Sequence, residues 1–257
     1  MKNNNCIILF FVLLVAIGCG PVKKDKYRME SFMDRYLRVS VIQAEQSDGR
    51  SLAIVYSWTG AIQQGGNNSE FKAISKKNGD TGYNVSFSRS SDGLYGFCYS
   101  LENNLKSIKL YAIDSYNSKY GSGAVLNGMV RYLSTSISPF ISSGYKNTFT
   151  MTENNTSDLF RNYLQNLYLK PLNYPQFVGK QEKPYFPVDK LLKDVSATDF
   201  KLVFPFMKTI GGSEKDLLGY LYFEELPNAP GNYNIKVEIT DEIGNVYSSQ
   251  ITMNFDY

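Results

Sequence analysis

Side chains able to perform nucleophilic or acid–base chemistry are scarce in this sequence. The 257 residues include no histidine, which excludes Ser-His-Asp and Cys-His catalysis as well as histidine-ligated zinc and haem. Of the three cysteines, only Cys98 lies beyond residue 19. A single cysteine cannot form an intramolecular disulfide or a cysteine metal cluster. Because Cys98 falls between aromatic residues with the spacing of a strand, we predict a buried structural thiol.

Residues 69–72 (Ser-Glu-Phe-Lys) fit the S-x-x-K pattern of serine β-lactamases and penicillin-binding proteins, in which the lysine helps to activate the serine. The partner motifs of those enzymes are not in place. Residues 91–93 (Ser-Asp-Gly) lack the required Asn, and residues 208–210 (Lys-Thr-Ile) lack the Gly of K-T-G. We interpret the segment as a chance match and predict no catalytic residue in the chain.

Carboxylates are the remaining acid–base candidates. Glycosidases hold two of them about 5–10 Å apart. The adjacent pairs Glu224-Glu225 and Asp241-Glu242 do not meet this need, because neighbours on a strand face opposite ways. The sequence leaves open a pair from distant segments, such as Asp114 with Glu224, so a carboxylate-dependent glycoside hydrolase stays an unfavoured alternative. No Asp-x-Asp-x-Asp-Gly run marks a calcium loop, and we expect neither a metal nor a cofactor.

Aromatic side chains are the better candidates for ligand contact. Tyr111, Tyr116 and Tyr120 flank residues 114–123, a loop rich in Ser, Asn and Gly. Such a loop can present an adaptable polar and aromatic surface, so we predict that these three tyrosines bind a ligand. The alternative is a solvated loop whose tyrosines fold back onto a sheet. Trp58, the only tryptophan, continues an apolar strand face, and we predict that it belongs to the core.

The elements that must position these residues are mostly strands. Several segments alternate apolar and polar residues with the strand period of two, at residues 52–58, 83–87, 95–101, 233–239 and 247–255. The chain is also rich in Tyr (20) and Phe (16), which favour strands. Short strands separated by Gly, Asn and Asp turns are typical of sandwiches. Helical spacing predicts one helix over residues 159–168 and a second short one over residues 29–36.

A weak internal repeat links the two halves of the chain. Similar patterns occur at residues 94–99 and 217–222, and again in the same order at residues 108–114 and 235–241. The repeat predicts two tandem sandwich domains, residues 34–143 and 144–257, each near the usual size of an immunoglobulin-like domain. The expected fold class is therefore mainly β, with two tandem immunoglobulin-like sandwiches and one or two short helices.

Residues 230–245 support this fold by resemblance. They carry a Pro-Gly-x-Tyr start, an alternating strand and an Asp-x-x-Gly-Asn turn. This order resembles the end of bacterial immunoglobulin-like domains, and it implies a fold rather than a function.

The first twenty residues resemble a bacterial lipoprotein signal. A charged start is followed by an apolar run from Ile7 to Ile17 and by residues 16–19 (Ala-Ile-Gly-Cys), which are similar to a lipobox. The run is shorter than the about 20 residues that a spanning helix needs, and it suits a removable signal. The resemblance implies a signal peptide over residues 1–18, lipidation of Cys19 and a tether over residues 19–33. Gly20 in place of Asp favours the outer membrane, on its periplasmic face or at the cell surface.

The whole chain is similar to uncharacterised lipoproteins of the Bacteroidetes type. Its net charge of +3 is small and its basic residues are scattered, so we expect no nucleic-acid partner. We predict a non-catalytic envelope lipoprotein that is held on the membrane by its lipid and binds a glycan or a protein partner. A structural or assembly component of an envelope complex is the main alternative.

Overall fold

The structure is a computed structural model, and it describes residues 26–65, 68–88, 98–172, 174, 176–210 and 212–256. The predicted signal, Cys19 and residues 91–97 lie outside this part of the chain. Two compact units are present. The smaller one comprises residues 1–28 and 85–93, and its described part includes most of β1 (Lys26–Met29) and all of β4 (Val85–Ser88). These two strands pair as a sheet of their own.

The larger unit is built on two sheets. The seven-stranded sheet contains, in spatial order, β5 (Tyr99–Leu101), β2 (Arg35–Asp48), β3 (Ser51–Gln63), β10 (Ser213–Phe223), β7 (Val130–Ser136) and β8 (Phe186–Leu191), with β9 (Phe206–Ile210) as a further neighbour of β10. The three-stranded sheet has the order β12 (Val246–Phe255), β11 (Gly231–Asp241) and β6 (Leu105–Ala112). Neighbouring strands are antiparallel except β2 and β5, which run parallel.

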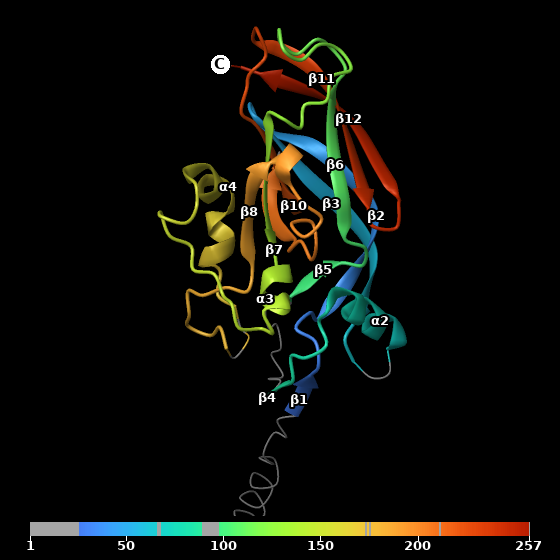
Figure 1. Cartoon of the computed structure of the whole chain (residues 1–257), viewed down its shortest axis with the longest axis vertical. Coiled ribbons are helices and arrows are strands. Elements are labelled where there is room, and N and C mark those ends of the chain that lie inside the picture. The colour runs from blue at the N-terminus through green and yellow to red at the C-terminus, as the bar shows by residue number, and fades with distance from the viewer. Residues whose placement is uncertain are drawn as a thin grey trace, which may run out of the picture. The chain divides into compact units, whose positions relative to one another are not determined.

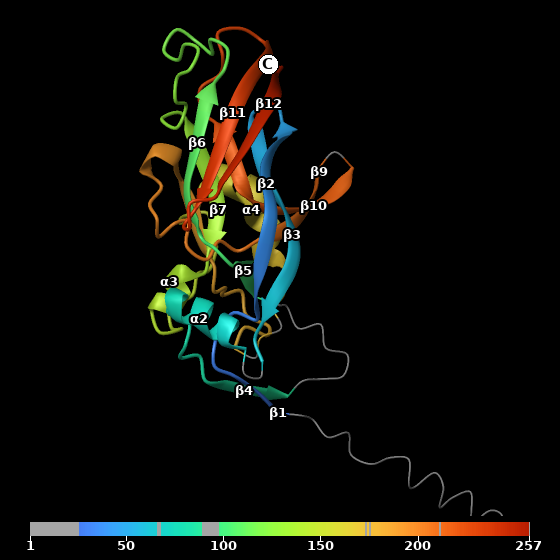
Figure 2. The ribbon, with the colours of Figure 1, turned by 90° about the vertical axis from the view of Figure 1, so that its right-hand side faces the viewer.

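One hydrophobic core lies between the two sheets. Ile235 and Val237 of β11 are fully buried, and they belong to the same cluster as Leu52 and Ile54 of β3. Figures 1 and 2 show β6, β11 and β12 as one layer against the layer that contains β2 and β3. The mainly β prediction is confirmed, and two packed sheets are compatible with a β-sandwich.

The two predicted domains do not form separate sheets. Strand β3, from residues 34–143, pairs with β10, from residues 144–257. Strand β6 pairs with β11 in the same way. The boundary predicted between residues 143 and 144 therefore does not separate two sandwiches. The period of two specifies which face of a strand is buried but not which strand lies beside it, so the repeat could not reveal this pairing.

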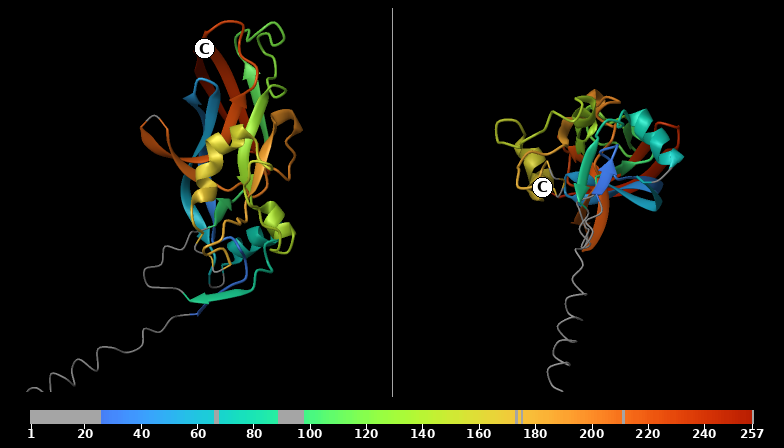
Figure 3. Two further views of the ribbon diagram at one scale, coloured as in Figure 1. Left: turned by 90° about the vertical axis from the view of Figure 1, so that its left-hand side faces the viewer. Right: turned by 90° about the horizontal axis from the view of Figure 1, so that it is seen from below.

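One helix packs against β7 and β10 on a face of the seven-stranded sheet, and two shorter helices lie at one end of the larger unit (Figure 3). The predicted central helix is confirmed as α4 (Asp158–Leu169), whose first turn is capped by the Ser157 side chain at 3.0 Å from the amide nitrogen of Phe160. Two further helices are α2 (Ser69–Asn78) and α3 (Ser138–Ser142), and a single 3₁₀ turn covers Leu192–Asp194.

The helix predicted over residues 29–36 is wrong. This segment contains the end of β1, a bend and the start of β2. Its apolar residues Met29, Phe32 and Met33 are fully buried, which explains their helix-like spacing. Among the helices of the described ranges, none combines the length and the apolar content needed to cross a membrane.

Candidate functional site

Tyr116, one of the three predicted ligand-binding tyrosines, is part of the core. Its side chain is only 1% exposed. The ring lies 6.0 Å from that of Phe223 and 5.6 Å from that of Phe255, and the hydroxyl donates to the main-chain oxygen of Glu225 at 2.8 Å. A ring held in this way offers no face to a ligand, so the prediction for Tyr116 does not fit its position. The loop folds its tyrosine back onto the sheet.

Tyr111 and Tyr120 are half-buried, and each lies beside a lysine. The Lys236 ammonium is 5.8 Å from the Tyr111 ring centre, and the Lys119 ammonium is 4.9 Å from that of Tyr120. No contact joins the two tyrosine rings among the described residues. They therefore do not form a common aromatic platform.

Cys98 and Ser69, neither of which was predicted to be catalytic, lie in positions that do not suit a nucleophile. The Cys98 side chain is fully buried, and burial raises the pKa of its thiol well above the usual value. Ser69 and Lys72 lie exposed in the first turn of α2. Glu70 between them pairs with Arg38 at 2.5 Å. The thiol is structural, and the S-x-x-K segment is the start of a short surface helix.

The carboxylates that the sequence paired hold separate positions. Asp114 accepts hydrogen bonds from Asn234, whereas Glu224 pairs with Arg131 of β7 at 2.6 Å. These contacts account for both groups without a catalytic dyad. Among the described residues, no group of three His, Cys, Asp or Glu side chains is placed to hold a metal ion.

Two carboxylates, the half-buried Asp34 and the buried Asp80, brace the start of the larger unit. Asp80 accepts from the amide nitrogens of Phe32 at 2.8 Å and Met33 at 2.9 Å. Asp34 accepts from the amide nitrogen of Cys98 at 2.7 Å, and burial raises its pKa to about 6. The Tyr174 hydroxyl also donates to Asp34, and the Tyr145 hydroxyl donates to Asp80 at 2.9 Å. Main-chain and tyrosine donors thus engage both carboxylates, so we assign them a structural role.

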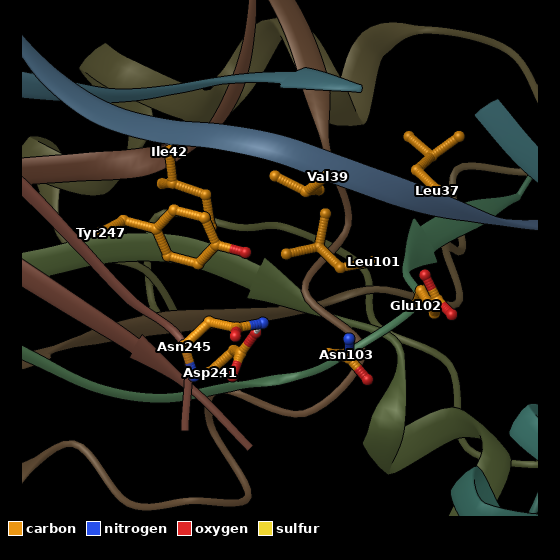
Figure 4. Close-up of a pocket in the computed structure, with 9 residues that line it drawn as sticks. All are labelled: Leu37, Val39, Ile42, Leu101, Glu102, Asn103, Asp241, Asn245 and Tyr247. Carbon is orange, nitrogen blue, oxygen red and sulfur yellow. Dashed lines mark hydrogen bonds between the residues drawn. The ribbon is translucent and has the colours of Figure 1, made fainter. Parts of the chain in front are cut away.

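The strongest candidate site is a depression where the three-stranded sheet ends over β2 (Figure 4). Apolar side chains come from β2 and β5. Polar ones come from the turn before β6, the end of β11, the turn after it and the start of β12. The lining residues are Leu37, Val39, Ile42, Leu101, Glu102, Asn103, Asp241, Asn245 and Tyr247. The space inside is about 40 Å³, which is room for about one water-sized group at about 30 Å³ each. A larger ligand must therefore lie across the depression and insert one substituent.

Trp58 is exposed to solvent and is the pairing neighbour of a residue that lines this depression. It lies directly opposite Val39 in the β2–β3 pairing, and directly opposed residues point to the same face of a sheet. Its side chain is 47% exposed, so the prediction of a core tryptophan is wrong. The predicted register is kept through Tyr56, which is 6% exposed. Trp58 continues that face past the end of the core.

The pairing of β2 and β3 is irregular where this face changes from buried at Tyr56 to exposed at Trp58. The register shifts on both sides of Val39, and Val41 is opposite Ser57. Ser40 is thus an extra residue in β2, and its hydroxyl donates to the main-chain oxygen of Ser57 at 3.2 Å. Such a bulge bends and twists a strand. The bulge lies where this face of the sheet becomes exposed to solvent.

The polar groups of the depression differ in how many contacts they already make with other protein groups. Asp241 accepts from the amide nitrogens of Ile243 at 3.1 Å and Asn245 at 2.8 Å, and from the Asn245 side chain at 2.9 Å. It is therefore committed to closing the β11–β12 turn. Glu102 lies 3.9 Å from the Arg38 guanidinium, and the Tyr247 hydroxyl points into the depression (Figure 4). The arrangement offers polar contacts beside an aromatic ring but no free acid–base pair.

Comparison of the chain with protein-family models, with curated proteins and with solved structures finds no match. The depression is therefore interpreted from its own geometry.

Proposed function

We propose that this chain is a non-catalytic binding module of a bacterial cell envelope, and that it binds a glycan across the depression beside Trp58. The observation that carries the proposal is the exposure of the only tryptophan next to a cluster of amide, carboxylate and hydroxyl groups. A sugar ring has an apolar C–H face and polar edges. Sites for such ligands combine an aromatic surface with a few polar groups that fix orientation.

The bound sugar would lie with one face on the Trp58 ring. One hydroxyl or hydroxymethyl group enters the depression, which suits its volume of about 40 Å³. Asn103 and Glu102 lie on one side of the opening and Asn245 on the other (Figure 4). Amides donate and accept, whereas a carboxylate accepts. This set complements sugar hydroxyls, which do both.

The membrane anchor forms the second part of the proposal. Its support is the resemblance of residues 1–19 to a lipoprotein signal. Lipidation at Cys19 would hold the binding module at the outer membrane, since several acyl chains anchor far more firmly than one. A Cys19→Ala variant tests this part: it should lose incorporation of a labelled fatty acid and move from the membrane to the soluble fraction. Unchanged labelling contradicts the anchor.

A glycan array with the full chain in non-ionic detergent tests the binding site. We expect at least one saturable hit, followed by a change in the fluorescence of Trp58, which is the only tryptophan. Calorimetry should then show at least a tenfold loss of affinity in Trp58→Ala and in Asn103→Ala.

The matched control is Tyr120→Ala, a half-buried aromatic residue that does not line the depression. A hit lost in Tyr120→Ala but kept in Trp58→Ala would move the site to the loop of residues 114–123. An array without any hit contradicts glycan binding for the sugars it carries.

A further inference from the structure

A second cavity lies at the end of α4, and its walls differ from those of the depression beside Trp58. Its volume is about 270 Å³. It is formed by the last turn of α4, by residues 171 and 177–183, and by the two residues after Phe149, which forms a bridge with Lys183. The lining residues are Thr150, Met151, Tyr168, Leu169, Pro171, Phe177, Gly179, Lys180, Gln181 and Lys183. Taking about 30 Å³ for each water-sized group, the cavity has room for roughly nine of them.

The ammonium of Lys183 is buried at this cavity. The residue is 2% exposed, which is rare for a lysine without an acidic partner. Its ammonium donates to the main-chain oxygen of Lys170 at 2.8 Å, just beyond the last residue of α4. A cation is favourable there, because the last carbonyl groups of a helix carry partial negative charge. An ammonium has three N–H groups, and this contact uses one of them.

No carboxylate compensates this charge within the described residues. Lys183 forms no ion pair there, and burial lowers the pKa of its ammonium. The walls contain a second lysine, Lys180, and no acidic residue. Glu182, the neighbour in sequence, is exposed and accepts from the Thr148 hydroxyl at 3.4 Å instead. The cavity is thus positively charged at Lys183.

The rest of the lining is mostly apolar. Met151, Tyr168, Leu169, Pro171 and Phe177 contribute hydrocarbon and ring surface. Leu169 is 73% exposed, whereas Leu167 and Tyr168 just before it in the helix are buried. Ligand cavities typically combine such apolar walls with one or two oriented polar groups.

We propose that this cavity binds an organic monocarboxylate of about six to eight carbons in all, whose carboxylate pairs with the Lys183 ammonium. The apolar body would lie against Met151, Leu169 and Phe177. A carboxylate supplies both the missing negative charge and acceptors for the remaining N–H groups. Charge-assisted hydrogen bonds of this kind are roughly twice as strong as neutral ones. The site shares no lining residue with the depression beside Trp58, so it stands or falls independently of glycan binding.

Calorimetry with hexanoate and its uncharged analogue hexanamide tests the proposal. The full chain is kept in non-ionic detergent, and micelles without protein supply the blank. We expect hexanoate to bind at least tenfold more tightly than hexanamide. In Lys183→Met this preference should disappear. Equal affinities for the two ligands in the unchanged protein, or no binding of hexanoate at millimolar concentration, would overturn the proposal.

A second variant keeps the test valid if Lys183→Met does not fold. Leu169→Glu puts a carboxylate on an exposed side chain at the cavity and should weaken hexanoate binding at least tenfold. Leu169→Gln, which adds no charge, should weaken it much less. Val246→Glu is the matched control, because Val246 is an exposed apolar residue outside the cavity lining. Unchanged binding in Leu169→Glu contradicts the site.

Discussion

The side-chain amide of Gln46 on β2 binds the main chain of Asn254 on β12 at both polar groups. Its nitrogen donates to the Asn254 oxygen at 2.9 Å, and its oxygen accepts from the Asn254 amide nitrogen at 3.0 Å. The amide thus imitates the pairing that a neighbouring strand would supply. Strand β12 is an edge of the three-stranded sheet, so this contact covers part of that edge and links the two sheets.

Gln46→Ala should therefore lower the free energy of unfolding by about 1–2 kcal/mol, since each lost hydrogen bond typically contributes about 0.5–1.5 kcal/mol. Chemical denaturation measures this loss. Gln43→Ala is the control, because Gln43 lies exposed on the same strand and binds only Glu45 in the described structure. Equal stability of the Gln46 and Gln43 variants would contradict a role for the amide in joining the sheets.

Gly219 allows β10 to approach β7 closely. Its φ is +149°, and an added Cβ would lie 2.5 Å from the main-chain oxygen of Leu133. The obstacle is backbone, which cannot rotate away. Gly219→Ala should therefore destabilise the protein by at least about 2 kcal/mol, as measured by thermal or chemical unfolding.

Gly121→Ala provides the comparison for this prediction. No atom lies within 4 Å of a Cβ added at Gly121. It should be neutral or slightly stabilising, because alanine restricts the unfolded chain. A Gly219 variant as stable as the Gly121 variant would show that β7 and β10 move apart at little cost.

Strands with unbroken alternation were predictable from the sequence, and bulged ones were not. Ile235, Val237 and Ile239 are buried in β11 as the pattern requires. In β2 the neighbours Tyr36 and Leu37 are both buried before Ser40, and Ile42 and Ala44 are buried after it. A single extra residue breaks the period of two, so the longest strand of the fold gave no clear signal.

The candidate sites depended on contacts between distant segments. Trp58 keeps the strand face predicted for it, but its exposure is decided by where the three-stranded sheet ends. Lys183 gave no motif, because its partner is the main-chain oxygen of Lys170. Every residue type has a main-chain oxygen, so the sequence does not reveal which one accepts the hydrogen bond. Tyr116 gave a misleading signal, since an aromatic residue in a polar loop has the same pattern whether it faces solvent or the core.

Cys98 should be unreactive in the folded protein. It is fully buried, and burial raises the pKa of its thiol. A reagent therefore cannot reach the sulfur, and the reactive thiolate form is scarce. Peptide mapping after treatment with iodoacetamide should show an unmodified Cys98 in native protein and full modification after denaturation. Ser69→Cys introduces a thiol at an exposed position and should react under native conditions. Rapid native labelling of Cys98 would mean that the segment before β5 opens easily.

The raised pKa of Asp34 predicts that the free energy of unfolding depends on pH. Burial raises its pKa in the folded protein to about 6, against an ordinary value of 3.8. Between these values the folded state binds more protons than the unfolded state. Stability from this group is therefore fully present below about pH 4 and is lost as pH rises toward 6. A difference of this size corresponds to at most roughly 3 kcal/mol.

Asp34→Asn isolates this contribution, because the amide keeps an acceptor oxygen for the Cys98 amide nitrogen and does not titrate. Denaturation midpoints measured from pH 4 to pH 7 should fall more steeply in the unchanged protein than in the variant. Burial also raises the pKa of Asp80, but Asp80 titrates in both proteins and largely cancels in the comparison. Parallel curves would contradict the raised pKa of Asp34. A steeper fall in the unchanged protein would establish that the buried carboxyl lowers stability at neutral pH.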